Sequence, residues 1–330
     1  MRKALAAIAA LVFPVLVLAA GPARAASLEP VTIANTSTNL QLVLPYIALK
    51  KGYFAAHGIA ASMTHVNGDA GSIPALVSGS VDFSIMTSTP ALTADAKGGD
   101  LKIISPLSTY PEQIVMRKKL ADKLGITAST PLAEKLAALK GRKVGVLDIG
   151  GGLQYQVVAL LISHGIDPRE VPIVGLAPFS SELIALKRGE IDVIGPAVPF
   201  GQTAVKDGYG VMIANIWGGE VPSLRGTPFE VMAVRRKWGQ AHAKTVAGVR
   251  AALQEAMDYL HKDPAGAAKF AHDWQPNIPL SVQTEAIGTG AGYPTSTTIT
   301  KAEFAGMQSF AKLSGAKTAA ITYDQAIWSK

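Results

Sequence analysis

The chain has 330 residues and a formal net charge of +7, and it contains no Cys. This length is enough for two globular domains with hydrophobic cores, and the absence of Cys excludes disulfides and lipid attachment through an N-terminal Cys. The Lys and Arg residues are scattered along the chain, so nucleic acid is not indicated as a partner.

The first 25 residues have the pattern of a secretory signal peptide. Arg2 and Lys3 precede an apolar stretch from Ala4 to Ala20, and small residues follow where a signal peptidase cleaves. A transmembrane anchor is the alternative, but an apolar stretch of about 17 residues is at the lower limit for a span, and a Gly-Pro pair ends it. We expect cleavage between Ala25 and Ala26 and a soluble protein in the periplasm.

Strands and helices alternate along the chain. Strands are predicted at 31–34, 60–66, 83–86 and 101–105, and helices at 41–51, 73–78 and 91–97, with Ser72 as an N-cap. The order then repeats, with strands at 143–147, 171–176, 193–194 and 211–216, and helices within 120–140, at 153–164 and ending at 188 after a Ser180-Ser181 cap. Further helices are predicted at 237–274, with a break at Asp263-Pro264, and at 302–313. This alternation predicts an α/β fold with parallel-rich sheets flanked by helices.

One eight-residue sequence motif, called the repeated phrase below, occurs twice in the chain. Residues 75–82 read ALVSGSVD and residues 185–192 read ALKRGEID, so Ala, Leu, Gly and Asp recur at the same four places. Each phrase is a helix end, a Gly that tolerates the left-handed closing conformation, and the start of a short apolar strand. One α/β unit has therefore been built twice, which predicts two similar lobes with a cleft for a small ligand.

The chain order predicts how the lobes are assembled. Lobe one is expected from residues 27–108 together with 225–330, and lobe two from 112–218. The extended segments 108–116 and 217–230 cross between them. Two such crossovers would form a hinge, because only a few backbone torsions need to change there.

Several segments resemble one family. Pro45 to Phe54 (PYIALKKGYF), the Gly79/Asp82 phrase, Leu139 to Val146 (LKGRKVGV) before a Gly-rich turn, and Gly165 to Pro168 (GIDP) are similar to periplasmic substrate-binding proteins of the sulfonate, taurine and nitrate type. These proteins share a superfamily with thiamine-pyrimidine binders, and the resemblance covers about residues 30–260. It implies a type II two-lobed periplasmic binding protein fold with a two-strand hinge that closes on the ligand. It also implies delivery of the ligand to an ABC permease and its ATPase in the inner membrane.

The ligand site is expected beyond the carboxyl ends of the strands, as in other open parallel sheets. The loops there are rich in Asn, Ser, Thr and Gly, contain no Lys or Arg, and in part precede helix N-termini, which favour an anionic group. The candidate ligand-binding residues are Asn35, Ser37, Thr38, Asn39, Ser72, Thr87, Ser88, Asp148, Gly151, Gly152, Tyr155, Pro199 and Trp217.

Acidic and aromatic side chains leave two questions open. Asp69, Asp148 and Glu182 lie in or beside these loops, where an acid can meet an amine or hydroxyl of the ligand or simply bond its own turn. Trp217 is expected at the rim of the cleft and Tyr155 near it, and ordinary core packing is the alternative for each.

Enzyme signatures are weak. Gly150 to Gly152 lacks the spaced dinucleotide fingerprint, and there is no Gly-Lys-Ser/Thr phosphate loop, no Gly-x-Ser-x-Gly turn and no His pair at metal-ligand spacing. The sequence favours a monomeric solute-binding component of an ABC importer, without cofactor, metal or catalysis, that captures a small organic anion such as a sulfonate or carboxylate, aromatic or not. A periplasmic lyase or hydrolase on the same scaffold, and a ligand sensor for a membrane receptor kinase, are the alternatives.

Overall fold

The computed structural model describes residues 27–217, 220–221, 224, 226–288, 292–318 and 321–329. The predicted signal peptide therefore lies outside the described residues. Across the described part of the chain, no helix combines the length and apolar character that a membrane span requires.

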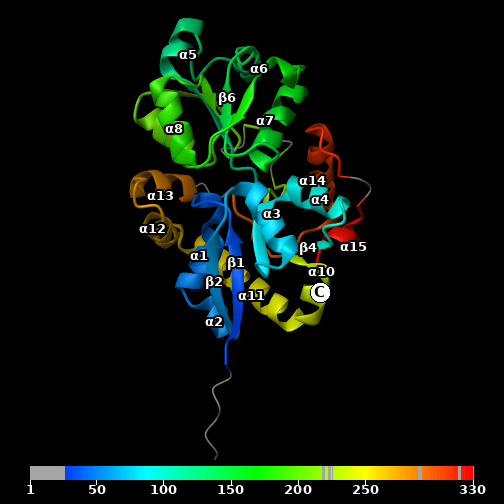
Figure 1. Cartoon of the computed structure of the whole chain (residues 1–330). Helices are drawn as coiled ribbons and strands as arrows, with labels where there is room; N and C mark the ends of the chain where they lie inside the picture. The colour runs from blue at the N-terminus through cyan, green and yellow to red at the C-terminus, as the bar shows by residue number, and fades with distance from the viewer. Residues whose placement is uncertain are drawn as a thin grey trace, which may run out of the picture.

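Two five-stranded sheets form two lobes (Figure 1). The lower lobe in the figure is built on the sheet order β2-β1-β3-β10-β4, in which β1 runs parallel to β2 and β3, and β10 runs antiparallel to β3 and β4. The strands are β1 (Glu29–Asn35), β2 (Ile59–His65), β3 (Phe83–Thr87), β4 (Leu101–Ser108) and β10 (Glu230–Arg235).

The upper lobe repeats this plan with the order β7-β6-β8-β5-β9. Here β6 runs parallel to β7 and β8, and β5 runs antiparallel to β8 and β9. The strands are β5 (Gln113–Arg117), β6 (Val144–Val146), β7 (Ile173–Gly175), β8 (Val193–Ile194) and β9 (Gly210–Asn215). The chain changes sheets between β4 and β5 and again between β9 and β10. Each strand that follows such a change lies antiparallel in its sheet, because it does not arrive through a helical crossover.

Helices cover both sheets. In the first lobe they are η1 (Leu40–Leu42), α1 (Val43–Lys50), α2 (Tyr53–Ala56), α3 (Gly68–Ser78), α4 (Ser88–Ala96), α10 (Arg236–Ala241), α11 (Ala243–Lys262), α12 (Pro264–Trp274), α13 (Leu280–Gly288), α14 (Lys301–Leu313) and α15 (Tyr323–Ala326). In the second they are α5 (Lys118–Leu124), α6 (Leu132–Ala137), α7 (Gly152–Ser163), η2 (Pro168–Glu170), α8 (Phe179–Arg188) and α9 (Phe200–Lys206). Figure 1 places α12 and α13 on one side of the level where the lobes meet. On the other side α7 contacts both α4 and α14.

The repeated phrase has the same structural role in both lobes. Gly79 ends α3 and Gly189 ends α8, each with a left-handed backbone (φ 85° and 78°). The Asp of each phrase then ties the following turn to a neighbouring strand. Asp82 accepts a hydrogen bond from Thr32 N at 2.9 Å, and Asp192 accepts one from Lys143 N at 3.2 Å. The predicted duplication is therefore present in the two lobes.

Replacing Gly79 by Ala is expected to lower the free energy of unfolding by about 1 kcal/mol. An added Cβ meets nothing closer than 3.5 Å, so the cost is that of the left-handed conformation alone. Urea unfolding monitored by circular dichroism measures the change. Gly288→Ala is the control, because Gly288 also closes a helix and nothing lies within 4 Å of its added Cβ. An equal loss in both variants would contradict the expectation.

Three helix starts differ from the prediction. Helix α3 begins at Gly68, so Ser72 lies inside the helix and is not its N-cap. Helix α8 begins at Phe179, directly after Pro178, which places the Ser180-Ser181 pair within the first turn. Segment 87–90 is the end of β3 and the start of α4, because Pro90 is tolerated in the first helical turn.

Candidate functional site

A cleft between the lobes contains two adjoining cavities. The larger has a volume of about 510 Å³, and the smaller, of about 10 Å³, shares four of its lining residues: Thr36, Ser37, Gly68 and Leu147. Both lie at the carboxyl ends of the central strands, where the sequence predicted the site. The larger cavity is lined further by residues of β2 and α9, of the segment before and into α8, and of the end of α12 and the turn after it, including Phe179, Phe200 and Trp274.

Five predicted site residues line these cavities. Ser37 and Thr38 contribute from the turn after β1, and Thr87 from the end of β3. Asp148 and Gly152 contribute from the turn that leads into α7. Loops from both halves of the duplication therefore meet across the cleft.

The other predicted residues line neither cavity. Asn35 and Asn39 are buried beside the turn after β1, where the Asn39 side chain donates to Ser37 Oγ. Ser72 and Ser88 are buried in α3 and α4, and Gly151 and Pro199 directly precede α7 and α9. Tyr155 lines a separate cavity of about 470 Å³ between α3, α4 and the start of α7.

Trp217 lies in the core of the first lobe, not at the rim of the cleft. Its side chain is buried, its Nε1 donates to Ala286 O at 3.2 Å, and its ring packs edge-to-face on Tyr293 with centroids 5.3 Å apart. Gly292 is in such close contact that an added Cβ would lie 1.9 Å from the indole. Large buried aromatic rings usually find such packing and a partner for the N–H, which is the alternative that the sequence left open.

Asp69 bridges the two lobes. Its carboxylate accepts bonds from Thr87 N (2.8 Å) and Thr87 Oγ1 (2.5 Å) in its own lobe and from Gly152 N (3.1 Å) at the start of α7 in the other. Burial raises the pKa of Asp69, and these three hydrogen bonds oppose that shift. The helix N-terminus of lobe two is thus held by an acid of lobe one, which joins the lobes directly at the cleft.

Asp148 makes the reciprocal contact from lobe two. Its Oδ2 lies 3.4 Å from Ala70 N in α3. Burial, and then the charge of Asp69, raise the pKa of Asp148 to about 6. A Cβ on Gly68 would come within 2.6 Å of Asp148 Oδ2, so only Gly allows this approach.

Glu230 and Gln41 form the wall of the smaller cavity on the side of lobe one. Gln41 Nε2 donates to Glu230 Oε1 at 2.7 Å, and both side chains are buried. The second oxygen of Glu230 and the amide oxygen of Gln41 have no hydrogen-bond partner. Burial, followed by the charge of Asp69, raises the pKa of Glu230 well above its ordinary value.

Two further acids lie behind the cleft in lobe two. Glu112, next to β5, and Glu182, in the first turn of α8, are both fully buried, and neither carboxyl group has a hydrogen-bond partner. Burial raises the pKa of each well above its ordinary value. A second contribution comes from Glu182 in the case of Glu112, and from Asp148 in the case of Glu182.

The sequence analysis pointed to Asp69, Asp148 and Glu182 but missed Glu112 and Glu230. Glu112 directly precedes β5 and Glu230 begins β10, so both lie outside the strand-end loops in which the site was expected. An acid next to an otherwise apolar strand, as in Glu230-Val231-Met232, is the sequence signal that could have identified them. Burying an acid costs free energy, so an acid at such a position indicates a functional role.

No cation balances these acids at the cleft. Neither cavity has a Lys or Arg among its described lining residues, and His65, in the larger one, is the only basic side chain there. Within the described ranges, no group of three His, Cys, Asp or Glu residues could hold a metal ion.

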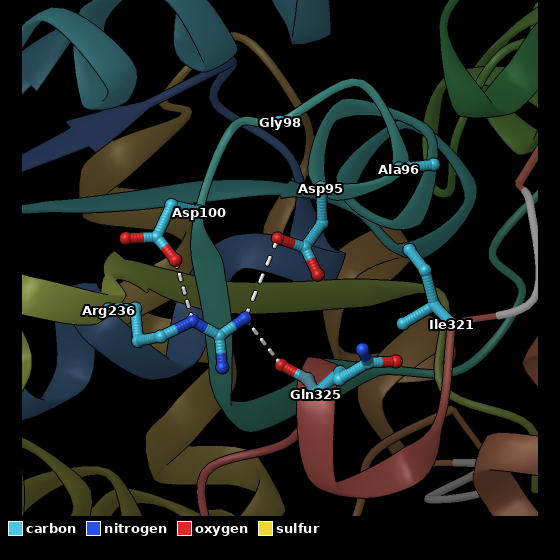
Figure 2. A pocket seen from close by; sticks show the side chains of 7 residues that line it. All are labelled: Asp95, Ala96, Gly98, Asp100, Arg236, Ile321 and Gln325. Carbon is cyan, nitrogen blue, oxygen red and sulfur yellow. Dashed lines mark hydrogen bonds and ion pairs between the residues drawn. The ribbon is translucent and has the colours of Figure 1, made fainter.

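A cavity of about 500 Å³ on the surface of lobe one has a different character (Figure 2). Its Arg236 is already engaged: Nε donates to Asp100 Oδ1 at 2.7 Å, and Nη2 donates to Gln325 O at 2.8 Å and lies 3.7 Å from Asp95. These contacts tie α10 to the segment after α4 and to α15, which is a structural role.

The two lobes, the doubled crossover and the cleft between them define the periplasmic binding protein fold. Residues 28–273 match the model of the NMT1-like family, and the chain belongs to this family. A search of curated protein sequences finds no match.

Solved structures share the fold at low sequence identity. A protein from Bordetella bronchiseptica RB50 matches with a TM-score of 0.77 and 23% identity, over 91% of this chain and 94% of that one. The alkanesulfonate-binding protein SsuA from Xanthomonas axonopodis pv. citri, bound to MOPS, matches with a TM-score of 0.71 and 21% identity, over 92% and 99%. The periplasmic nitrate-binding protein NrtA from Synechocystis PCC 6803 matches with a TM-score of 0.65 and 16% identity, over 77% and 69%.

Replacing Gly152 by Ala is expected to keep the lobes apart. The added Cβ would lie 2.4 Å from Thr87 Oγ1 in the opposite lobe, and overpacking of this kind costs about 1–3 kcal/mol. Small-angle scattering should show a larger radius of gyration than that of the natural protein. The melting temperature of each lobe should remain unchanged. Gly288→Ala, which meets no atom within 4 Å, is the control. If the Gly152→Ala protein is as compact as the natural one, a Cβ at position 152 does not keep the lobes apart and the prediction is wrong.

Proposed function

We propose that this chain is the periplasmic solute-binding component of an ABC importer, which captures a small organic anion, a sulfonate or carboxylate, and closes its lobes on it. The observation that carries the proposal is the hydrogen bond from Gly152 N to Asp69 across a cleft with a cavity of about 510 Å³. This bond can form only when the lobes are together, so the free energy of closure is coupled to whatever fills the cavity.

Two features support this choice of ligand. Two proteins of the same fold are named for alkanesulfonate and nitrate binding. The aromatic side chains Phe179, Phe200 and Trp274 suit the apolar part of an organic ligand.

The proposal includes the finer predictions made from the sequence. Export follows from cleavage after Ala25, and the lobes consist of 27–108 with 225–330 and of 112–218. Closure takes place about segments 108–116 and 217–230. The partners are an ABC permease and its ATPase, and the monomeric protein carries out no catalysis.

A thermal-shift screen followed by scattering tests this function. Alkanesulfonates, amino sulfonates, aromatic carboxylates and nitrate are added to the mature protein. A compound bound only by the folded state raises the melting temperature by an amount that grows with its concentration. The same compound should reduce the radius of gyration of the Gly152→Ala protein, in which the lobes start apart. Turnover of a bound compound would favour the periplasmic enzyme, and binding without turnover supports the importer component.

A further inference from the structure

The deep end of the cleft carries more hydrogen-bond acceptors than the protein itself uses. Asp148, Glu230 and Gln41 all line the smaller cavity. Gln41 is 2% exposed and Glu230 is 3% exposed, yet Gln41 Oε1 and Glu230 Oε2 lack partners. Gln41 Nε2 donates to Glu230 Oε1, so the NH2 group of the Gln41 amide is occupied and its oxygen remains free. An unpaired buried acceptor costs free energy unless a ligand satisfies it.

The size of this cavity limits what can fill it. A volume of about 10 Å³ accommodates one group of the size of a water molecule, which is also the size of an ammonium head. An ammonium carries three N–H donors and no acceptor. The lining offers three acceptors, on Asp148, Glu230 and Gln41, and no Lys or Arg competes for them.

We propose that the smaller cavity is a subsite for a primary ammonium group of the ligand, held by Asp148, Glu230 and Gln41. This rests on the proposed solute-binding function and specifies its ligand further. The rest of the ligand lies in the adjoining larger cavity, which the smaller one meets at Thr36, Ser37, Gly68 and Leu147. Recognition by the subsite requires the ammonium, whether or not the ligand also carries an acid.

A matched set of probes on the natural protein tests the subsite. The probes are 2-phenylethylamine, its N,N,N-trimethyl derivative, 2-phenylethanol and 3-phenylpropionate, which differ in charge and in N–H donors on one scaffold. We expect calorimetry at pH 7.5 to show that the amine binds at least about tenfold more tightly than each of the other three. Only the amine combines a positive charge with N–H donors, and hydrogen bonds from a charged donor are stronger than neutral ones. The proposal is overturned if the trimethyl derivative, the alcohol or the carboxylate binds equally well, or if the amine does not bind.

Asp148→Asn should weaken amine binding about tenfold, since it removes one charge and leaves the size of the side chain almost unchanged. Asp122→Asn is the control, because Asp122 is an exposed acid on α5 that pairs with Lys118, and its amine affinity should stay within about twofold of the natural protein's. Equal affinities of the natural and Asp148→Asn proteins would exclude this role.

The pH dependence has a definite sign. The groups that face Asp148 are Asp69 from α3, Glu182 from α8 and Glu230 from β10. Amine affinity should rise between pH 5 and pH 7.5 as Asp148 ionises, and the rise should be shallower in Asp148→Asn. Affinity that rises toward acidic pH would refute the ammonium subsite. If alkanesulfonates bind and close the lobes while amines do not, the importer function stands and this subsite fails. If neither class binds, both fail.

Discussion

Glu182→Gln is expected to stabilise the protein at pH 8 and to leave its stability at pH 4 unchanged. Glu182 is fully buried without a hydrogen-bond partner, and burial followed by the charge of Asp148 raises the pKa of its carboxyl group. The folded chain therefore keeps the Glu182 proton at pH values where the unfolded chain, with a Glu pKa of about 4.3, has lost it.

The sign of the effect follows from proton linkage. Wherever the folded state binds more protons than the unfolded state, the free energy of unfolding falls as the pH rises. Between about pH 4.3 and the raised folded pKa, one such group lowers it by about 1.4 kcal/mol per pH unit. Gln cannot ionise, so the substitution removes this loss, and Glu112→Gln should act in the same direction.

Urea unfolding at a series of pH values measures this directly. Glu134→Gln is the control, because Glu134 is an exposed acid in the short helix α6 of the same lobe. A gain in stability that is the same at pH 4 and pH 8, or a gain in the control of equal size, would show that the buried carboxyl group does not cause it.

Trp217→Ala is expected to lower the free energy of unfolding by about 3–5 kcal/mol, the usual cost of deleting a large buried aromatic side chain. The substitution removes the packing on Tyr293 and Gly292 and the hydrogen bond from the indole N–H to Ala286 O. Because Trp217 follows β9 on the return crossover and packs in the first lobe, its loss also frees the segment that joins the lobes.

Guanidinium unfolding with a two-state fit provides the measurement. Tyr155→Ala is the comparison, because Tyr155 is only partly buried at a cavity and should cost about 1 kcal/mol. A Trp217→Ala protein with normal stability and weakened ligand binding would instead support the rim position expected from the sequence.

Much of the fold was predictable because its signals are local. Gly79 and Gly189 end their helices with left-handed backbones, and Asp263 caps α12 ahead of Pro264, as the residue types suggested. The helix starts were less accurate. Ser72, Ser180 and Ser181 have cap chemistry but lie inside helices, because the position of a helix start also depends on packing and on a preceding Pro.

The site was only partly predictable. Its position beyond the strand ends follows from topology, and Ser37, Thr87 and Gly152 came from that rule. The rule does not distinguish a loop residue that faces the cleft from one that faces the core. Ser88 met the same rule and is buried, and Trp217, expected at the cleft as an aromatic residue on a crossover, packs in the core of the first lobe.

Local residue chemistry along the chain accounts for the alternation of strands and helices, the duplication and the absence of a basic side chain from the predicted cleft loops, since each depends on neighbours in sequence. The meeting of Asp69 with Gly152 and of Gln41 with Glu230 is decided only by the folded chain. These pairs bring together a helix of one lobe with a helix start of the other, and a turn of 3₁₀ helix with the return strand. Their desolvation, their raised pKa values and their unsatisfied acceptors arise from burial, which no pattern in the sequence measures.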